Sequence, residues 1–278
     1  MRNWKLLPRD PHVAKYVECY WFLEKEHDDI GNVHPKLNPN PTAHLILAAD
    51  EQKYEYTQGE SQIKGSGSHW LFPHKKTFLM DHSQPFRIVG IKFQVGALYS
   101  LDYISPQINL DNVVDICIHE LIDSVSFDVS GLLAQAVEYP EQAGNTLDEY
   151  LLPWLLGSHE DKYSALIRRA VPMLADVPIA QIGKALHCSQ RTIERAFLRV
   201  TNLTLKQYQS MIRLEEVLSY LYSLGGESVN WVDVANKFEF SDQPHLIRYL
   251  KNAIGSTPGE YAKQRNLTID VYGDFEQF

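Results

Sequence analysis

The sequence contains 278 residues, of which 44% are hydrophobic, and it carries a formal net charge of -9. This length predicts two domains, each with an apolar core. No apolar run is long enough to span a membrane, the start MRNWKLLPRDPH is too short and polar for a signal peptide, and the three cysteines lie far apart. We therefore expect a soluble, cytoplasmic protein with no membrane partner and no disulfide framework.

Short β-strands are predicted in the first 110 residues. The aromatic cluster YVECYWFLEKE predicts a strand or strand pair that packs into a core, and its alternative interpretation is a wall of a ligand pocket. Turn residues separate the strand-like runs that follow. Closely spaced short strands favour a small β-barrel or sandwich. The predicted strands lie at 43–48, 53–58, 68–72, 76–80 and 86–94.

The sequence of this region shows no motif typical of a metal site or of an enzyme. The six histidines at 27, 34, 44, 69, 74 and 82 include no His-x-His pair that a strand could present on one face to a metal ion. The sequence contains no nucleophile elbow, P-loop or dinucleotide-binding fingerprint. We predict no catalytic residue, no metal site and no cofactor. A small-molecule site would be a dry, aromatic-lined pocket with Trp21 or Trp70 near it.

Residues 111–157 are predicted to be helical. LDNVVDICIHELIDSV and DVSGLLAQAVEY space their apolar residues as helices do, and Thr146 with Glu149 forms a capping box that would start a third helix ending at Leu156. The polar residues GSHED at 157–161 then form the predicted linker.

A helix-turn-helix pattern begins after a supporting helix at 162–174, which Pro172 must kink or end. Residues 178–186 predict one helix, His187-Cys188 a turn, and Ser189 the cap of a second helix at 190–200. Two helices joined this closely must cross on a shared apolar face. In the second helix, at 190–200, the side chains predicted to face outward are Gln190, Arg191, Thr192, Glu194 and Arg195.

The pattern recurs after a long connecting helix. Thr204 and Gln207 form a capping box for residues 205–223, which at 1.5 Å per residue span about 28 Å. Asn230 would cap a helix at 231–237, and a second helix would run from Ser241 to Gly255, followed by a third that starts at Thr257. The connector can place both reading helices in successive major grooves. The outward residues of the second reading helix include Gln243, His245 and Arg248.

The negative charge is unevenly distributed. Residues 1–160 contain 12 Lys+Arg and 22 Asp+Glu, residues 161–265 contain 14 and 10, and residues 266–278 contain none and 3. The helix-turn-helix segment alone is positive, as expected for a DNA-binding module. We predict that the outward residues named above read bases. The predicted phosphate contacts are Ser189, Thr204, Lys206, Ser241, Lys251 and Thr257.

These motifs resemble those of the AraC/XylS family of bacterial transcription regulators. The first match consists of Ser189, Arg191-Thr192, Arg195 and Phe197. The second is denser and consists of FSDQ at 240–243, Arg248, Lys251, Gly255, Thr257-Pro258 and Tyr261.

The sequence departs from the family pattern at four positions. Asn202 and Glu239 replace glycines, and Leu246 and Leu250 replace residues that are usually phenylalanine. Asparagine tolerates the left-handed conformation, whereas glutamate resists the positive φ of a turn glycine. The leucines keep the core apolar.

The resemblance implies an α+β protein, with an N-terminal cupin-like β-barrel or sandwich and helical segment, and an all-α C-terminal domain with two helix-turn-helix motifs. The expected divisions are 1–110 for effector binding, 111–157 for a helical linker or dimerisation segment, 162–265 for DNA binding, and 266–278 for a tail. Helices after the barrel supply the dimer contact in similar regulators, and the alternative is that they only cover the barrel.

The implied function is a sequence-specific DNA-binding transcription regulator, more often an activator, controlled by a small molecule or partner acting on the N-terminal domain. Double-stranded DNA is the expected partner, and RNA polymerase, a small-molecule effector and a second copy of the chain are candidates. The alternatives are a cupin-like enzyme with a DNA-binding appendage and a protein-interaction adaptor. Arg191, Arg195 and Arg248 argue against the adaptor, which would lack outward basic residues.

Overall fold

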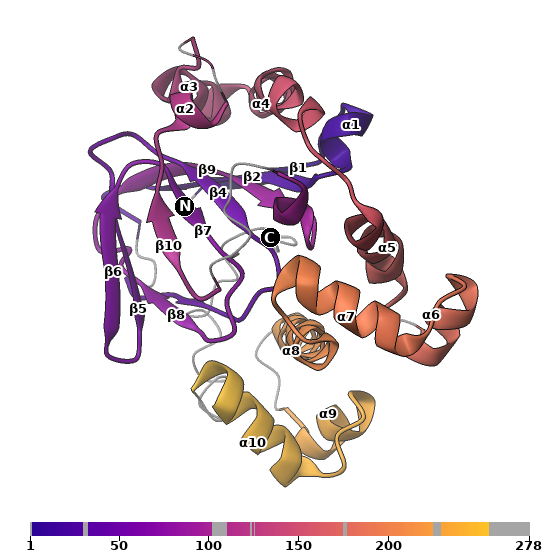
Figure 1. Cartoon of the computed structure of the whole chain (residues 1–278). Coiled ribbons are helices and arrows are strands. Elements are labelled where there is room, and N and C mark those ends of the chain that lie inside the picture. The colour runs from indigo at the N-terminus through magenta and orange to yellow at the C-terminus, as the bar shows by residue number, and fades with distance from the viewer. Residues whose placement is uncertain are drawn as a thin grey trace.

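The protein folds as a two-sheet β-sandwich followed by a set of helices, and its fold class is α+β (Figure 1). The computed structural model describes residues 2–29, 33–101, 110–122, 124, 126–174, 177–224 and 229–255. None of the helices in these ranges is both long enough and apolar enough to cross a membrane.

Two antiparallel sheets form the sandwich. The six-stranded sheet has the order β1 (Arg2–Leu6), β2 (Val17–Lys25), β9 (Phe86–Phe93), β4 (His44–Leu47), β7 (His69–Leu71) and β10 (Val113–Asp115). The four-stranded sheet has the order β3 (Lys36–Leu37), β8 (Phe78–Met80), β5 (Lys53–Gln58) and β6 (Ser61–Ser66).

Strand β2 is buried on both faces because the six-stranded sheet is covered on both sides. Side chains alternate along a strand, so Trp21 and Leu23 point between the two sheets, whereas Tyr20 and Phe22 belong to the apolar cluster under the helices. Gly90 on β9 pairs with Trp21, and a Cβ at position 90 would lie 1.8 Å from the indole. Glycine is therefore required where the indole crosses the neighbouring strand.

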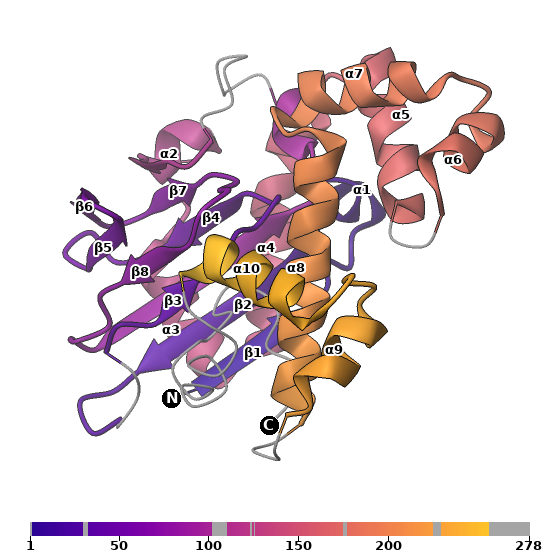
Figure 2. The same cartoon turned by 90° about the horizontal axis from the view of Figure 1, so that it is seen from below.

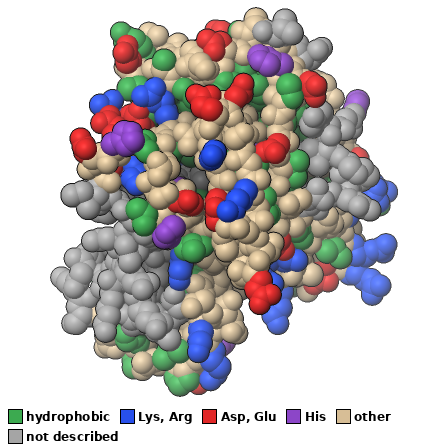
Figure 3. All heavy atoms as spheres, turned by 90° about the vertical axis from the view of Figure 1, so that its left-hand side faces the viewer, with side chains coloured by type: hydrophobic (Ala, Val, Ile, Leu, Met, Phe, Trp, Pro, Cys, Tyr) green, Lys and Arg blue, Asp and Glu red, His purple; other side chains and the backbone are tan. Residues whose placement is uncertain are grey.

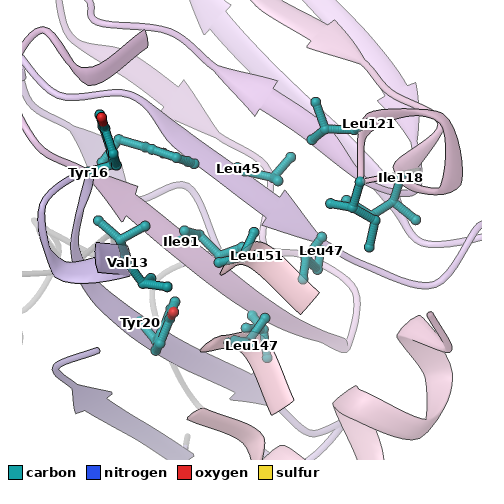
Figure 4. Packing of buried hydrophobic residues seen from close by; sticks show 14 of the residues in the cluster. Val13, Tyr16, Tyr20, Leu45, Leu47, Ile91, Ile118, Leu121, Leu147 and Leu151 are labelled. Atoms are coloured by element: carbon teal, nitrogen blue, oxygen red, sulfur yellow. The ribbon is translucent and has the colours of Figure 1, made fainter. Parts of the chain in front are cut away.

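Helices cover the outer face of the six-stranded sheet. These are α1 (Pro11–Ala14), α2 (Ile118–Leu121), α3 (Val129–Glu138) and α4 (Pro140–Leu156). Figure 4 shows how Leu147 and Leu151 of α4 pack against Tyr20 and Ile91 of the strands. Burying these side chains stabilises the layer, since a fully buried leucine contributes roughly 1.5–3 kcal/mol.

The remaining helices form the C-terminal part. α5 (Lys162–Ala170) is followed by a short 3-10 turn at Val171–Met173, then by α6 (Ile179–Ala185) and α7 (Gln190–Thr201). α8 (Leu205–Ser223) leads to α9 (Trp231–Lys237) and α10 (Gln243–Ile254). Figure 2 shows α8 connecting α5–α7 to the pair α9 and α10. Hereafter α5–α7 are called the first unit, and α9 with α10 the second unit.

Most of the predicted elements are confirmed, with two corrections. The five predicted strands are β4, β5, β7, β8 and β9, each trimmed by at most two residues. Residues 113–115 are wrongly predicted to be helical, because they pair with β7 as an edge strand, and the sandwich extends to Asp115. Thr146 does not start a helix, because α4 begins six residues earlier, with Pro140 in its first turn.

The buried carboxylate of Asp148 fixes α4 to the start of the chain. It accepts hydrogen bonds from the Tyr20 hydroxyl at 2.6 Å and from the backbone N–H groups of Arg9 and Asp10 at 2.8 and 2.9 Å. Burial, reinforced by this carboxylate, raises the pKa of Tyr20 above its usual range. The hydroxyl therefore remains a donor throughout the ordinary pH range.

Replacing Asp148 by alanine should destabilise the N-terminal domain by about 3 kcal/mol, because three donors lose an ionised acceptor and two of them are backbone groups that cannot move away. Urea denaturation monitored by tryptophan fluorescence measures the loss. Glu149→Ala, at the adjacent exposed position, is the control and should change stability by less than about 0.5 kcal/mol. Equal stability of the two variants would contradict this role of Asp148.

Candidate nucleic-acid interface

The first unit is a helix-turn-helix whose turn and cap follow the local sequence chemistry. His187 in the turn adopts φ 53°, and Ser189 caps α7 by accepting a 3.1 Å hydrogen bond from the Thr192 backbone N–H. α6 and the turn approach so closely that a Cβ on Gly183 would lie 2.7 Å from the Cys188 carbonyl oxygen. Asn202 ends α7 in the left-handed conformation, as predicted.

The outer face of α7 presents polar side chains to solvent. Its inner face buries Ile193, Ala196 and Phe197, so one stripe of the helix is fixed in the core. Glu194 accepts a 2.8 Å hydrogen bond from the Gln190 side-chain amide, one turn away. The exposed residues are Gln190, Arg191, Thr192, Glu194 and Arg195.

The second unit repeats this arrangement. Asn230 caps α9 by accepting from the Val232 backbone N–H, as predicted. Glu239 adopts φ 56° in the turn, so the backbone is left-handed there although the residue is not glycine. Such a conformation costs about 1–2 kcal/mol for a residue with a Cβ. The surrounding helices must supply that energy.

The cap of α10 differs from the prediction. Asp242, and not Ser241, caps the helix: its carboxylate accepts a 2.6 Å hydrogen bond from the His245 backbone N–H, and α10 starts at Gln243. Asp242 has an extended backbone, as a cap residue does, with φ -165°. The Ser241 hydroxyl instead lies 3.2 Å from Nδ1 of the His245 ring.

The predicted contact residues of α10 are partly buried at its start and exposed further along. Gln243 and His245 are half-buried, and the His245 ring lies edge-on to Phe240. Arg248 and Lys251 are exposed, opposite a buried stripe of Leu246, Leu250 and Ile254.

The remaining predicted phosphate contacts fall at the start of α8 and beyond α10. The Thr204–Gln207 capping box is present, with the Gln207 side chain accepting from the Thr204 N–H at 2.8 Å and the Thr204 hydroxyl accepting from the Gln207 N–H at 3.2 Å. Lys206 is exposed beside it. Thr257, the helix expected after it and the tail lie outside the described residues.

Sequence reasoning missed an arginine on α7 that contacts the N-terminal domain. Arg199 donates from Nε to the Tyr99 hydroxyl at 2.9 Å, and its guanidinium lies 4.4 Å from the centre of the Tyr163 ring. The Tyr99 hydroxyl in turn donates to Asp161 at 2.9 Å. Nothing local in the sequence marks Tyr99 as a partner, because it lies 100 positions away.

A hollow of about 680 Å³ lies between the two sheets and is partly open to solvent. Its lining includes the aromatic side chains of Tyr54, Tyr56 and Phe86 and two buried histidines, His69 and His82. Charged side chains also line it: Glu51, Lys53, Glu55, Lys64 and Asp81. Both His69 ring nitrogens have partners, the Tyr56 hydroxyl at 3.0 Å and the Gly67 carbonyl at 2.9 Å. The His82 ring is tilted by 53° to the Phe86 ring, and the ring centres lie 4.4 Å apart.

Trp21 and Trp70 lie in the two apolar cores, and neither is among the residues that line the hollow. The Trp21 indole donates to His44 at 3.3 Å. The Trp70 indole N–H is buried without an acceptor in the described part of the chain. The same part of the chain contains no group of three His, Cys, Asp or Glu side chains suited to a metal ion.

Charge distribution separates the faces of the molecule. On the face that carries β5 and β6, acidic and basic side chains are mixed (Figure 3). A mixed surface produces no strong field of one sign. The predicted base contacts lie on the two helices α7 and α10.

Comparison with known proteins gives two domain matches. Residues 182–264 match a helix-turn-helix domain family, and residues 6–115 match a domain of unknown function, DUF6597. No curated protein matches the sequence.

Three solved structures illustrate the structural likeness. ToxT from Vibrio cholerae O395 is 11% identical, with a TM-score of 0.45, over 89% of this chain and 98% of that one. Wild-type ToxT from Vibrio cholerae strain SCE256, bound to an unsaturated fatty acid, is 12% identical, with a TM-score of 0.42, over 90% and 97%. The AraC-like transcriptional activator CuxR is 11% identical, with a TM-score of 0.26, over 77% and 86%.

Two capped helix-turn-helix units, joined by one helix and placed within a matching domain, define a DNA-binding transcription regulator. All of the signature residues quoted above, including Arg191, Arg195, Arg248 and Gly255, fall inside the matched range. Residues 182–264 belong to the matched helix-turn-helix domain family, and the motifs within them resemble those of the AraC/XylS regulators.

The corrected cap of α10 yields a direct test. Asp242→Ala should destabilise the second unit by about 1 kcal/mol, because the His245 N–H loses its acceptor at the helix start. Ser241→Ala is the control and should cost only a few tenths of a kcal/mol. Hydrogen exchange of the α10 amides measures both changes. A larger loss of stability for Ser241→Ala than for Asp242→Ala would mean that Ser241 is the cap of α10.

The buried histidines predict a stability that falls in acid. Burial lowers the pKa of His69 to about 4, and burial with the nearby Lys25 charge lowers the pKa of His82 to about 4. An unfolded histidine titrates near pH 6.5. The contribution of these neutral histidines to the free energy of unfolding is therefore fully present above about pH 6.5. This contribution decreases as the pH falls towards 4, by at most about 1.4 kcal/mol per pH unit for each histidine.

Urea denaturation of the wild type and of His82→Gln at pH 7, 5.5 and 4.5 checks this expectation. The variant should lose less stability between pH 7 and 4.5, because it lacks one of the buried histidines that become protonated at a higher pH in the unfolded chain than in the folded protein. Parallel losses in the two proteins would show that His82 does not titrate differently on folding.

Proposed function

We propose that this regulator reads a specific DNA sequence with α7 and α10 and that a small molecule acting on the N-terminal domain controls it. The observation that carries the proposal is the exposure of Arg191, Arg195 and Arg248 on helices that are each anchored by a buried apolar stripe. Arginine forms bidentate bonds to guanine edges in the major groove. The other proposed base contacts are Gln190, Thr192, Glu194, Gln243 and His245.

Phosphate contacts would come from the helix starts and from exposed lysines. The hydroxyls of Ser189 and Thr204 already serve as caps, so the remaining N–H groups of those helix starts are the donors that a phosphate would meet. Lys206 and Lys251 add exposed cations. Ser241 and Thr257 complete the proposed set.

The hollow between the sheets supports the proposed effector site. Its volume of about 680 Å³ is within the range of ligand sites, and its lining combines apolar and aromatic side chains with polar and charged ones at the more exposed positions. His82 supplies a largely buried imidazole to the lining. The occupant would therefore have an apolar body and one hydrogen-bonding group.

The direction of regulation follows from the family resemblance, which favours activation and RNA polymerase as a further partner. One chain carries two reading helices, so it could bind an asymmetric site without a second copy. The proposed site of action is the cytoplasm. The alternative functions, a cupin-like enzyme and an adaptor, have no specific observation in their favour.

The readout proposal predicts base-specific losses. A preferred duplex is first selected from random sequences with the full chain, and then Arg195→Ala and Arg248→Ala are titrated on it. Each substitution should weaken the free energy of binding to the selected duplex by about 1–3 kcal/mol and relax the preference at one base position. Arg169→Ala, at an exposed position of the supporting helix α5, should leave that preference unchanged.

A scrambled duplex separates the possible roles of these arginines. If Arg195 and Arg248 read bases, their loss should affect binding to the scrambled duplex much less than binding to the selected one. Equal weakening on both duplexes would mean that these side chains contact phosphates. Selection that enriches no sequence would contradict specific DNA reading altogether.

A further inference from the structure

The first unit is attached to the six-stranded sheet through an apolar joint. Directly after β9, Val95 and Tyr99 pack into the apolar cluster of α5–α7, as does Leu110 further along. Gly96 has φ 80°, and a Cβ there would lie 2.6 Å from the Val200 side chain of α7. The core of the first unit is therefore completed by residues of the N-terminal domain.

The segment 157–161 strengthens this attachment. The Ser158 hydroxyl donates to the Tyr16 hydroxyl at 2.6 Å, the His159 N–H donates to the Ser100 carbonyl at 2.9 Å, and Lys15 pairs with Glu160 at 3.3 Å. These residues were expected to form a linker, but hydrogen bonds hold them against the N-terminal domain. The first unit and the six-stranded sheet thus form one body.

The second unit is attached to the other sheet, and by a different kind of contact. The Thr77 hydroxyl, immediately before β8, donates to the Ala253 carbonyl at 2.9 Å, and the Lys36 ammonium of β3 donates to the Ile254 carbonyl at 3.3 Å. Both carbonyls lie in the last turn of α10, where intrahelical donors run out and a cation is favoured. Among the described residues, the apolar cluster of this unit draws only on residues 214–254.

The hollow lies between the sheets that carry these two attachments. Ile46 and Ile88 line it from the six-stranded sheet, and Tyr56 and Met80 line it from the four-stranded sheet. Strand β8 is only three residues long. Met80 at its end thus faces the hollow, while Thr77 just before its start holds α10.

A buried histidine joins the loops at the α10 end of the sandwich. The His74 ring is hydrogen bonded to the Asn38 carbonyl at 2.7 Å, just after β3, and to the Phe72 carbonyl at 3.2 Å, just after β7. The two sheets are therefore tied together near α10 and separated where the hollow opens. Packed sheets move as units rather than deforming smoothly.

We propose that the four-stranded sheet is a lever between the effector hollow and the second recognition helix. A small apolar molecule held between the sheets tilts the four-stranded sheet about the His74 tie. Lys36 and Thr77 carry this movement to the C-terminal turn of α10. The first unit stays with the six-stranded sheet, so the ligand changes the position of one reading helix relative to the other.

This lever deepens the proposed function, because it assigns the regulation to the second unit. A ligand shifts such an equilibrium only by its differential affinity for the two sheet positions. The tests below use neither DNA nor an effector. If they fail, the proposal of DNA reading by α7 and α10 is unaffected.

The first test removes the attachment of α10. In the full chain, Lys36→Met with Thr77→Val should speed hydrogen exchange in the amides of α9 and α10 about tenfold, because two capping donors are lost. Exchange in α5–α7 should not change. The control combines Lys76→Met, at an exposed lysine just before β8, with Thr57→Val on β5 of the same sheet. No acceleration, or equal acceleration in both units, would overturn the proposal.

The second test fills the hollow from within. Ala48→Trp adds an indole to a lining residue whose side chain belongs to the apolar cluster between the sheets, whereas Gln62→Trp adds one to an exposed position on β6 outside the hollow. Ala48→Trp should alter hydrogen exchange at the last turn of α10 at least threefold while leaving α7 unchanged, and Gln62→Trp should alter neither. An effect of Ala48→Trp on both recognition helices, or on neither, would contradict the lever.

A combined variant decides whether the signal passes through the two hydrogen bonds. Residues that act through one another show non-additive effects. Adding Ala48→Trp to the Lys36→Met/Thr77→Val chain should therefore produce no further change at α10. A full, additive effect would mean that the sheet and α10 communicate by another route. If Ala48→Trp does not fold, the exchange data for Lys36→Met/Thr77→Val and its control still decide whether the two bonds hold α10.

Discussion

Burial of the six-stranded sheet on both faces determines where the other parts of the molecule lie. One face of β2 and β9 packs under α3 and α4, and the other faces the four-stranded sheet. The sheet contributes side chains to two separate apolar cores, so the helical layer and the second sheet are both positioned by it. The Asp148 carboxylate adds a polar tie within the helical face. The first DNA-binding unit then docks on residues that directly follow β9.

The two DNA-binding units have the same local design but different attachments. Each has a left-handed residue other than glycine in its turn, His187 in one and Glu239 in the other. In each, a polar side chain caps the reading helix, Ser189 or Asp242. The first unit shares its apolar core with the N-terminal domain, whereas the second is held there by hydrogen bonds to backbone carbonyls. Apolar docking is hard to reverse in small steps, whereas two polar contacts can be broken and remade.

Local chemistry made the helical half largely predictable from sequence. The caps at Ser189, Thr204 and Asn230 and the left-handed Asn202 depend on side chains within a few residues of the backbone groups they satisfy. Ser241 was mistaken for the cap because two residues of cap-forming type are adjacent, and sequence alone does not reveal which one has the extended backbone.

Long-range pairing accounts for what sequence did not predict. Residues 113–115 were mistaken for helix because their strand character comes from pairing with β7, some forty residues earlier. The contacts of Arg199 with Tyr99 and of Thr77 with Ala253 join segments that have no common local pattern. The hollow lies between Tyr54, Tyr56 and Phe86, whereas the tryptophans proposed for it fill the cores on either side of the sheet.

The shared core of the first unit has a consequence for how the chain is made. Domains emerge from the ribosome N-terminal end first. Val95, Tyr99 and the strands that place them are synthesised well before α7. The surface that completes the first unit can therefore fold before that unit leaves the ribosome. The nascent helices can then bury their apolar faces against it as they emerge. A gene encoding the helical half alone would produce a polypeptide with an unfilled gap in its core, exposed to chaperones and proteases.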